Sequence, residues 1–211
     1  MKHNGHKLFT LVELLVLLCI VFMLFSLLLP ALQKAKGKSN QMYCMSNMNQ
    51  IGKGYYFYVD DYNGYLCRYD EWCMLLEPYL KQRWVGKSYV GPYKWGTGMD
   101  LYFCPSNCSG LSSESCSYLV SEIIVGGYYS ASALMISQIK KPSSVFLQAE
   151  SAAAASGYFW RSVYQDSHLF VGNDCRIGWV HGNGANVLFV DGHVSGISMN
   201  HITTSMYHDY Q

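Results

Sequence analysis

Three polar residues near the C-terminus have side chains of the types that bind metal ions or move protons: His181, Asp191 and His193. No activated nucleophile stands beside them, and the sequence contains no Gly-x-Ser-x-Gly elbow. Asp191 also precedes Gly192 between two β-rich runs, and this position gives it a turn role. We therefore interpret the three residues as structural. A metal site and a catalytic site are the open alternatives.

The two runs that flank Asp191-Gly192 are Ala185–Val190 and His193–Ile197. Two such runs separated by Asp-Gly are the strongest short signal for a β-hairpin, because both turn positions favour positive φ. We expect His181 to donate a hydrogen bond to the hairpin backbone.

The eight cysteines are the second group that could do chemistry. Cys104, Cys108 and Cys116 have a spacing that fits no common zinc module, so disulfides or thiols are favoured. Cys19 lies in an apolar run, which leaves an odd number outside it: Cys44, Cys67, Cys73, Cys104, Cys108, Cys116 and Cys175. So many cysteines favour an oxidising, extracytoplasmic compartment.

Other chemistries have less support. Gly-Lys-Ser occurs at Gly37 and Gly86, but the first glycine of a phosphate loop is missing at Leu32 and Lys81. The net charge of +1 argues against a nucleic-acid partner. We expect no enzyme activity and no cofactor, with Ca²⁺ at the acidic turn Asp60–Gly64 as an open alternative.

Eighteen Tyr and five Trp, clustered between Tyr55 and Tyr102, could stack on sugars. We favour the simpler interpretation, in which they fill the core of a small domain.

The elements that position these residues fall into two parts. Residues 1–59 carry six Lys and one Glu, net +5, whereas residues 60–211 carry nine Lys or Arg and thirteen acidic residues, net −4. Leu8 to Leu29 is apolar except for Glu13, Thr10, Cys19 and Ser26, and spans roughly 33 Å as a helix. This length predicts a membrane helix rather than a cleaved signal peptide.

Residues 31–59 are expected to form an amphipathic stalk helix. Apolar residues recur at helical spacing on one face: Leu32, Ala35, Met42, Met45, Met48, Ile51, Tyr55 and Tyr58. Gly37, Gly52 and Gly54 weaken this helix, so tertiary packing must hold it.

Residues 60–211 are expected to form an α/β head. Its predicted elements are a helix-ending turn at Asp60–Gly64, a helix at Trp72–Leu80, a loop over 84–100, a short strand at Leu101–Phe103, a strand at Val145–Ala149, a loop at Ser151–Ser156 and the hairpin. The fold class is therefore α+β, with a long N-terminal helix packed on a small antiparallel sheet.

The segment Phe9-Thr10-Leu11-Val12-Glu13-Leu14-Leu15-Val16 resembles the N-terminus of type IV pilins and type II secretion pseudopilins. The resemblance implies that residues 1–8 are a leader, which prepilin peptidase removes before Phe9, and that the new amine is methylated. It implies that Glu13 neutralises the amine of a neighbouring subunit and that residues 9–30 form the assembly helix. Pro30 lies where pilins often carry a proline, whereas Leu8 stands where the family prefers Gly.

The C-terminal part resembles a large pseudopilin-like group named for a His and an Asp-Gly separated by nine residues, here His181 and Asp191-Gly192. Segments around Cys44 and Cys104-Pro105-Ser106 also look like that group. The resemblance implies a pilin-like fold and a Cys44–Cys104 disulfide that ties the stalk to the head.

The expected function is that of a structural subunit of a type II secretion or type IV pilus-like filament. Its expected partners are prepilin peptidase, other pseudopilin subunits and the inner membrane, with the head in the periplasm or outside the cell. The alternative, which Leu8 favours, is an uncleaved membrane-anchored protein whose head binds a glycan or another surface ligand.

Overall fold

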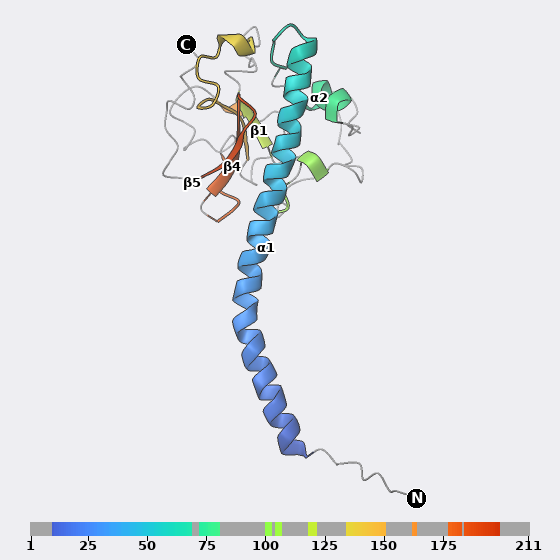
Figure 1. Ribbon diagram of the computed structural model, residues 1–211, viewed down its shortest axis with the longest axis vertical. Helices are drawn as coiled ribbons and strands as arrows, with labels where there is room; N and C mark the ends of the chain where they lie inside the picture. The colour runs from blue at the N-terminus through green and yellow to red at the C-terminus, as the bar shows by residue number, and fades with distance from the viewer. Residues whose placement is uncertain are drawn as a thin grey trace, which may run out of the picture. The chain divides into compact units, whose positions relative to one another are not determined.

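The computed structural model describes residues 10–68, 72–80, 100–102, 104–106, 118–121, 134–150, 162–163, 177–182 and 184–198. The chain divides into two compact units, residues 1–39 and residues 40–211. One helix, α1 (Leu11–Asp61), contributes residues to both units (Figure 1). The predicted loop residues 84–99 and 151–156 lie outside the described part of the chain.

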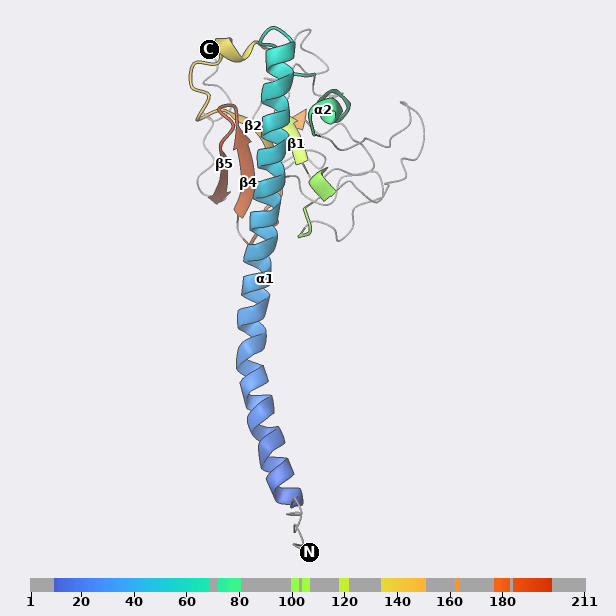
Figure 2. The ribbon, with the colours of Figure 1, turned by 45° about the vertical axis from the view of Figure 1, so that its right-hand side comes forward.

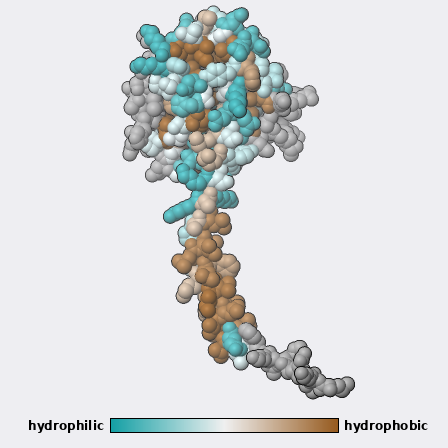
Figure 3. Space-filling view, viewed as in Figure 1, coloured by the Kyte–Doolittle hydropathy of each residue, from teal (hydrophilic) through white to brown (hydrophobic). Residues whose placement is uncertain are grey.

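In the first unit, α1 carries apolar side chains that are exposed all around it. Leu11, Phe22 and Leu27 are among the most exposed, and the surface of this stretch is apolar in Figure 3. The helix continues through Pro30 without a break. It is long and apolar enough near the N-terminus to cross a membrane, as predicted.

In the second unit, α1 buries one face. Met48, Ile51, Tyr55 and Tyr58 of the predicted stripe are buried, and Met45 is half-buried. The prediction was wrong for Leu32, Ala35 and Met42, which are exposed. Helical periodicity marks a face but does not tell where along the helix tertiary contacts begin, and here burial begins at Cys44.

The helix ends as the sequence predicts. Val59 O accepts a hydrogen bond from Gly64 N at 2.9 Å, and Asn63 and Gly64 both have positive φ, at 52° and 86°. This left-handed geometry at the helix C-terminus satisfies a carbonyl that the helix leaves open. After the turn, α2 (Trp72–Leu80) coincides with the predicted short helix.

A five-stranded sheet has the order β3-β1-β2-β4-β5. Its strands are β1 (Tyr118–Ser121), β2 (Phe146–Glu150), β3 (Ser162–Val163), β4 (Gly184–Phe189) and β5 (Val194–Ser198). Strands β1, β2, β4 and β5 pair antiparallel, and the two-residue β3 pairs parallel with β1. The predicted α+β class and small antiparallel sheet are confirmed.

The short strand predicted at Leu101–Phe103 is wrong. Asp100–Tyr102 form the 3₁₀ turn η1, whose Leu101 and Tyr102 side chains are buried, and Phe103 lies outside the described residues. Two adjacent buried apolar residues fit a single turn as well as a strand, so the short apolar run was ambiguous. A second 3₁₀ turn, η2 (Ile136–Gln138), precedes β2.

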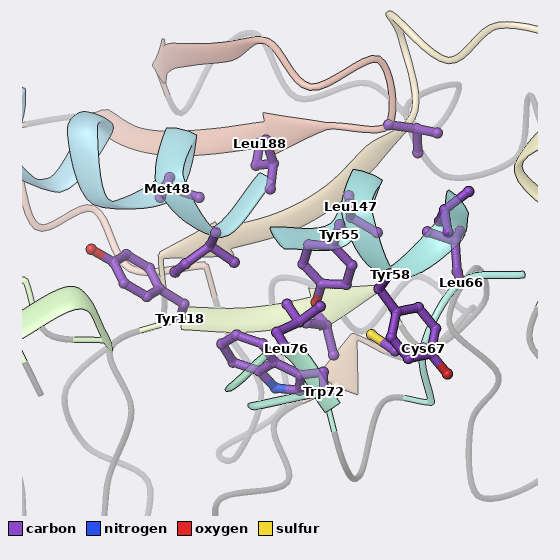
Figure 4. Packing of buried hydrophobic residues seen from close by; sticks show 14 of the residues in the cluster. Met48, Tyr55, Tyr58, Leu66, Cys67, Trp72, Leu76, Tyr118, Leu147 and Leu188 are labelled. Atoms are coloured by element: carbon purple, nitrogen blue, oxygen red, sulfur yellow. The ribbon is translucent and has the colours of Figure 1, made fainter. Parts of the chain in front are cut away.

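The main core lies between α1, α2 and one face of the sheet (Figures 2 and 4). It includes Tyr55 from α1, Trp72 from α2 and Leu188 from β4. A Cβ at Gly52 would lie 2.9 Å from Leu188 Cδ1, and one at Gly54 would lie 2.8 Å from Leu80 Cδ2. These glycines weaken the helix locally but allow α1 to approach β4 and α2 closely.

The hairpin between β4 and β5 is confirmed, but its predicted turn geometry is wrong. Phe189 O accepts a hydrogen bond from Gly192 N, and His193 O accepts one from Phe189 N, both at 2.9 Å. Among the turn residues only Gly192 has positive φ, at 86°. The loop therefore has three residues, with Gly192 in the left-handed position of a G1 bulge, so Asp191 does not need positive φ.

Replacing Gly192 by Ala is expected to cost about 1–3 kcal/mol of unfolding free energy, because an Ala at positive φ is strained and its Cβ would lie 2.7 Å from the Tyr56 ring. Tyr56 cannot move freely, since its hydroxyl donates to Val190 O at 2.7 Å. Urea unfolding of the full chain in detergent micelles measures the change. The matched control is Gly182→Ala, where φ is +70° but no atom of the described residues beyond the chain neighbours lies within 4 Å of the added Cβ. Equal losses in the two variants would show that Tyr56 does not restrict this position.

Candidate functional site

Four potential ligand side chains meet inside the second unit: Cys44, Cys104, Glu150 and His181, which we call the buried tetrad. Cys44 lies in α1, Cys104 follows η1, Glu150 is the last residue of β2, and His181 precedes β4. One ligand atom from each residue lies within 4.8 Å of all the others. The two thiols and the carboxylate are fully buried, and the side chain of His181 is 2 % exposed.

The imidazole of His181 is the centre of the buried tetrad. Its Nε2 lies 2.8 Å from Glu150 Oε1 and 3.3 Å from Cys104 Sγ. Cys44 Sγ lies 2.6 Å from Cys104 Sγ. Sequence reasoning paired the two cysteines through family resemblance, and their sulfur atoms are indeed adjacent. Whether they are bonded stays a prediction.

Asn186 of β4 fixes the position of the Glu150 carboxylate through two hydrogen bonds. Its backbone N–H donates to Glu150 Oε2 at 2.8 Å, and its side-chain Nδ2 donates to Glu150 Oε1 at 3.1 Å. The same Nδ2 donates to the backbone oxygen of Gln41 in α1 at 3.2 Å. Asn186 therefore links the tetrad to the helix and to the sheet.

The tetrad changes the proton affinities of its members. Hydrogen bonding from the Cys44 thiol, with a further contribution from His181, lowers the pKa of Cys104 to about 6 against the opposing effect of burial. The hydrogen bond to Cys104 and then burial raise the pKa of Cys44. Burial would lower the pKa of His181, but its contacts with Cys104 and Glu150 outweigh this and raise it to about 9. These contacts therefore favour the thiolate form of Cys104 and the protonated form of the His181 ring.

The predicted role of His181 toward the hairpin was wrong in part. Its ring does not donate to the hairpin backbone but faces Cys104 and Glu150, whereas its backbone pairs with Gly184 at the start of β4. The sequence pattern correctly identified His181 as a structural residue. It could not identify Cys104 and Glu150 as partners of the ring, because they come from other elements of the fold.

Asp191 and His193 do not belong to the buried tetrad. Asp191 Oδ1 accepts a hydrogen bond from His193 N at 3.1 Å and contacts His193 Nδ1. The His193 ring stacks on Phe189, with centroids 4.3 Å apart. These contacts form and stabilise the turn, as the structural interpretation predicted for Asp191.

No protein-family model, curated protein or solved structure matches this chain. Its function must therefore be argued from its own residues.

At the N-terminus, the structure describes Glu13 but not the predicted cleavage residues Leu8 and Phe9. Glu13 Oε2 accepts hydrogen bonds from Thr10 N at 2.9 Å and Thr10 Oγ1 at 2.8 Å, and Glu13 N donates to Thr10 Oγ1 at 3.2 Å. Thr10 and Glu13 thus form a capping box at the start of α1. Sequence reasoning overlooked this motif, although the Thr-x-x-Glu spacing was visible.

The sequence analysis also named the Asp60–Gly64 turn, the other cysteines and the aromatic residues between Tyr55 and Tyr102 as possible sites. Asp61 Oδ2 accepts a hydrogen bond from the Tyr79 hydroxyl at 2.6 Å, and within the described ranges the Asp60–Gly64 turn gathers no group of three acidic, His or Cys ligands. Cys67 is buried in the main core. Cys108, Cys116 and Cys175 lie outside the described residues. Several aromatic residues between Tyr55 and Tyr102 fill the main core, which agrees with the structural interpretation for those residues.

Two important residues, Glu150 and Asn186, were missed. Glu150 follows a buried apolar strand and has no distinguishing spacing to other ligands. Asn186 did carry a signal, because it interrupts the apolar run Ala185–Val190 and is fully buried. A polar residue inside a buried strand must find hydrogen-bond partners, and this requirement could have led to a search for its partner.

Proposed function

We propose that the protein is a pseudopilin-like structural subunit of a type II secretion or type IV pilus-like filament. The first part of α1 would span the inner membrane before assembly and then pack against other subunits. The second unit would form the extracytoplasmic head. Prepilin peptidase would remove residues 1–8, and catalysis would play no part.

The observation that carries this proposal is the first part of α1. Its apolar side chains are exposed all around the helix, with Leu11 at 80 % and Leu27 at 72 %. Such a surface requires a lipid or protein environment. A membrane supplies the first, and equivalent helices of neighbouring subunits supply the second. Repeated head-to-tail contacts, in which one surface of each subunit binds a different surface of the next, produce open filaments.

Glu13 would have two roles in this scheme. Its carboxylate caps α1 through Thr10. Removal of residues 1–8 would place a positive α-amino group on Phe9, directly before Thr10, in each subunit. The carboxylate of Glu13 could then neutralise the amine of the neighbouring subunit and set the axial register.

The Glu13→Gln variant separates these two roles. Gln also serves at the third position of a capping box, so the helix start should be preserved, but the negative charge is lost. We expect this variant to reach the membrane in normal amounts and to disappear from sheared, sedimented filaments. The measurement compares membrane and filament fractions by immunoblot in cells that carry the assembly machinery.

Thr10→Ala is the matched control, since it weakens the cap and keeps the charge, and it should still assemble. Intact mass and N-terminal sequencing of the native protein complete the test, with an expected chain of 203 residues beginning at methylated Phe9. A chain that still begins at Met1, together with normal behaviour of Glu13→Gln, would contradict the proposal. That result would favour the membrane-anchored binding protein.

A further inference from the structure

We propose that the buried tetrad binds a Zn²⁺ ion that fastens α1 to the sheet. This site is independent of filament assembly, because all four residues belong to the second unit. Thiolate, imidazole and carboxylate are the ligand types that Zn²⁺ uses in proteins, and the tetrad offers four ligands, the number that structural zinc sites have.

The number of protons that His181 Nε2 can donate supports a bound cation in the tetrad. His181 Nε2 carries at most one proton, yet it faces both Cys104 Sγ at 3.3 Å and Glu150 Oε1 at 2.8 Å. One N–H cannot point directly at two acceptors. A divalent cation between them would bind the nitrogen lone pair, the sulfur and the carboxylate oxygen together.

A disulfide between Cys44 and Cys104 is the competing explanation, but it accounts for only half of the site. A disulfide would join only the two sulfur atoms, which lie 2.6 Å apart, and Glu150 and His181 would pair with each other but have no bond to the sulfur atoms. A bound Zn²⁺ uses all four side chains, and the thiol protons and the proton on His181 Nε2 are released to solvent when it binds.

The surroundings of the tetrad fit a closed, structural site. All four side chains are buried, which leaves no open position for a substrate. Asn186 orients the carboxylate through two hydrogen bonds, as the residues behind metal ligands commonly do. The ligand pairs are far apart in the sequence, with Cys44 and Cys104 separated by 60 residues and Cys104 and His181 by 77. One ion would therefore join distant segments of the head.

Metal analysis of the full chain tests this inference. The protein is purified in detergent with reductant, incubated with Zn²⁺, freed of unbound metal and analysed by plasma mass spectrometry. We expect one Zn²⁺ per chain in the unmodified protein. Cys44→Ser and Glu150→Gln should lose most of it, whereas Cys67→Ser, which changes a buried cysteine outside the tetrad, should retain it.

Co²⁺ substitution of the unmodified chain provides a measurement that requires no variant to fold. Tetrahedral coordination with thiolate ligands gives intense visible and thiolate charge-transfer absorption, and we expect both. Absence of these bands, or a Zn²⁺ content that the tetrad variants leave unchanged, would overturn the inference. A Cys44–Cys104 disulfide in protein isolated from native membranes would also overturn the inference. Such a disulfide lowers the mass of the chain by two hydrogen atoms, and chelators do not change this mass.

Discussion

Glu150→Ala is expected to lower the free energy of unfolding by about 3–5 kcal/mol, because removing one partner of a buried ion pair leaves the other uncompensated. The carboxylate is fully buried and receives three hydrogen bonds or ionic contacts, from Asn186 N, Asn186 Nδ2 and His181 Nε2. The Ala variant would leave the buried Asn186 N–H and the His181 ring without this acceptor. Urea unfolding of the full chain in micelles, followed by tryptophan fluorescence, measures the loss.

A chelator in the buffer ensures that this loss comes from the protein contacts and not from a bound metal ion. Gln148→Met is the matched control in the same strand. Gln148 is also fully buried, but within the described part of the chain neither of its amide atoms has a hydrogen-bond partner. Its replacement by an apolar residue of similar size should be neutral or stabilising. If Glu150→Ala lost no more stability than this control, the proposed importance of the carboxylate network would be refuted.

Leu188→Ala is expected to cost about 3–5 kcal/mol, as large-to-small changes in a well-packed core do. Leu188 is fully buried on β4, with its neighbours Gln148 on β2 and Val194 on β5. A Cβ added at Gly52 would lie 2.9 Å from Leu188 Cδ1, so the Leu188 side chain fills the space between the helix and the sheet. The substitution would open a cavity at the contact that holds α1 on the head.

The same unfolding experiment provides the measurement for Leu188→Ala. Met42→Ala removes a comparable apolar side chain from an exposed position of α1, and it should change stability by less than about 0.5 kcal/mol. A loss below about 1 kcal/mol for Leu188→Ala would mean that the site collapses and refills, contrary to the tight packing at Gly52.

Much of the fold could be predicted because its signals are local. The α2 helix matches its prediction at both ends, and the turn after α1 follows from Asn63-Gly64. The β4–β5 hairpin follows from Asp191-Gly192 between apolar runs. In each of these elements, neighbouring residues supply the periodicity or the turn chemistry that specifies the backbone.

Other features needed information that a local pattern does not contain. The face of α1 was predicted correctly from Met48 to Tyr58 but extended too far toward Leu32, because burial depends on which residues the sheet and α2 cover. The β4–β5 turn was located correctly but assigned the wrong geometry. Asp-Gly fits both a two-residue loop and the observed loop with a G1 bulge, and only the pairing of Leu188 with Val194 distinguishes them.

The sequence by itself determined an apolar helix at the N-terminus with a carboxylate at Glu13, and a small α+β head that contains a hairpin. These properties depend on composition and on spacings of a few residues. Only the tertiary structure decided that Cys44, Cys104, Glu150 and His181 meet in one buried site. Glu150 and His181 are the two members of this site that lie closest together in the sequence, and they are still 31 residues apart. Their contact depends on the pairing of β2 with β4 and on the packing of α1, and no local pattern encodes either.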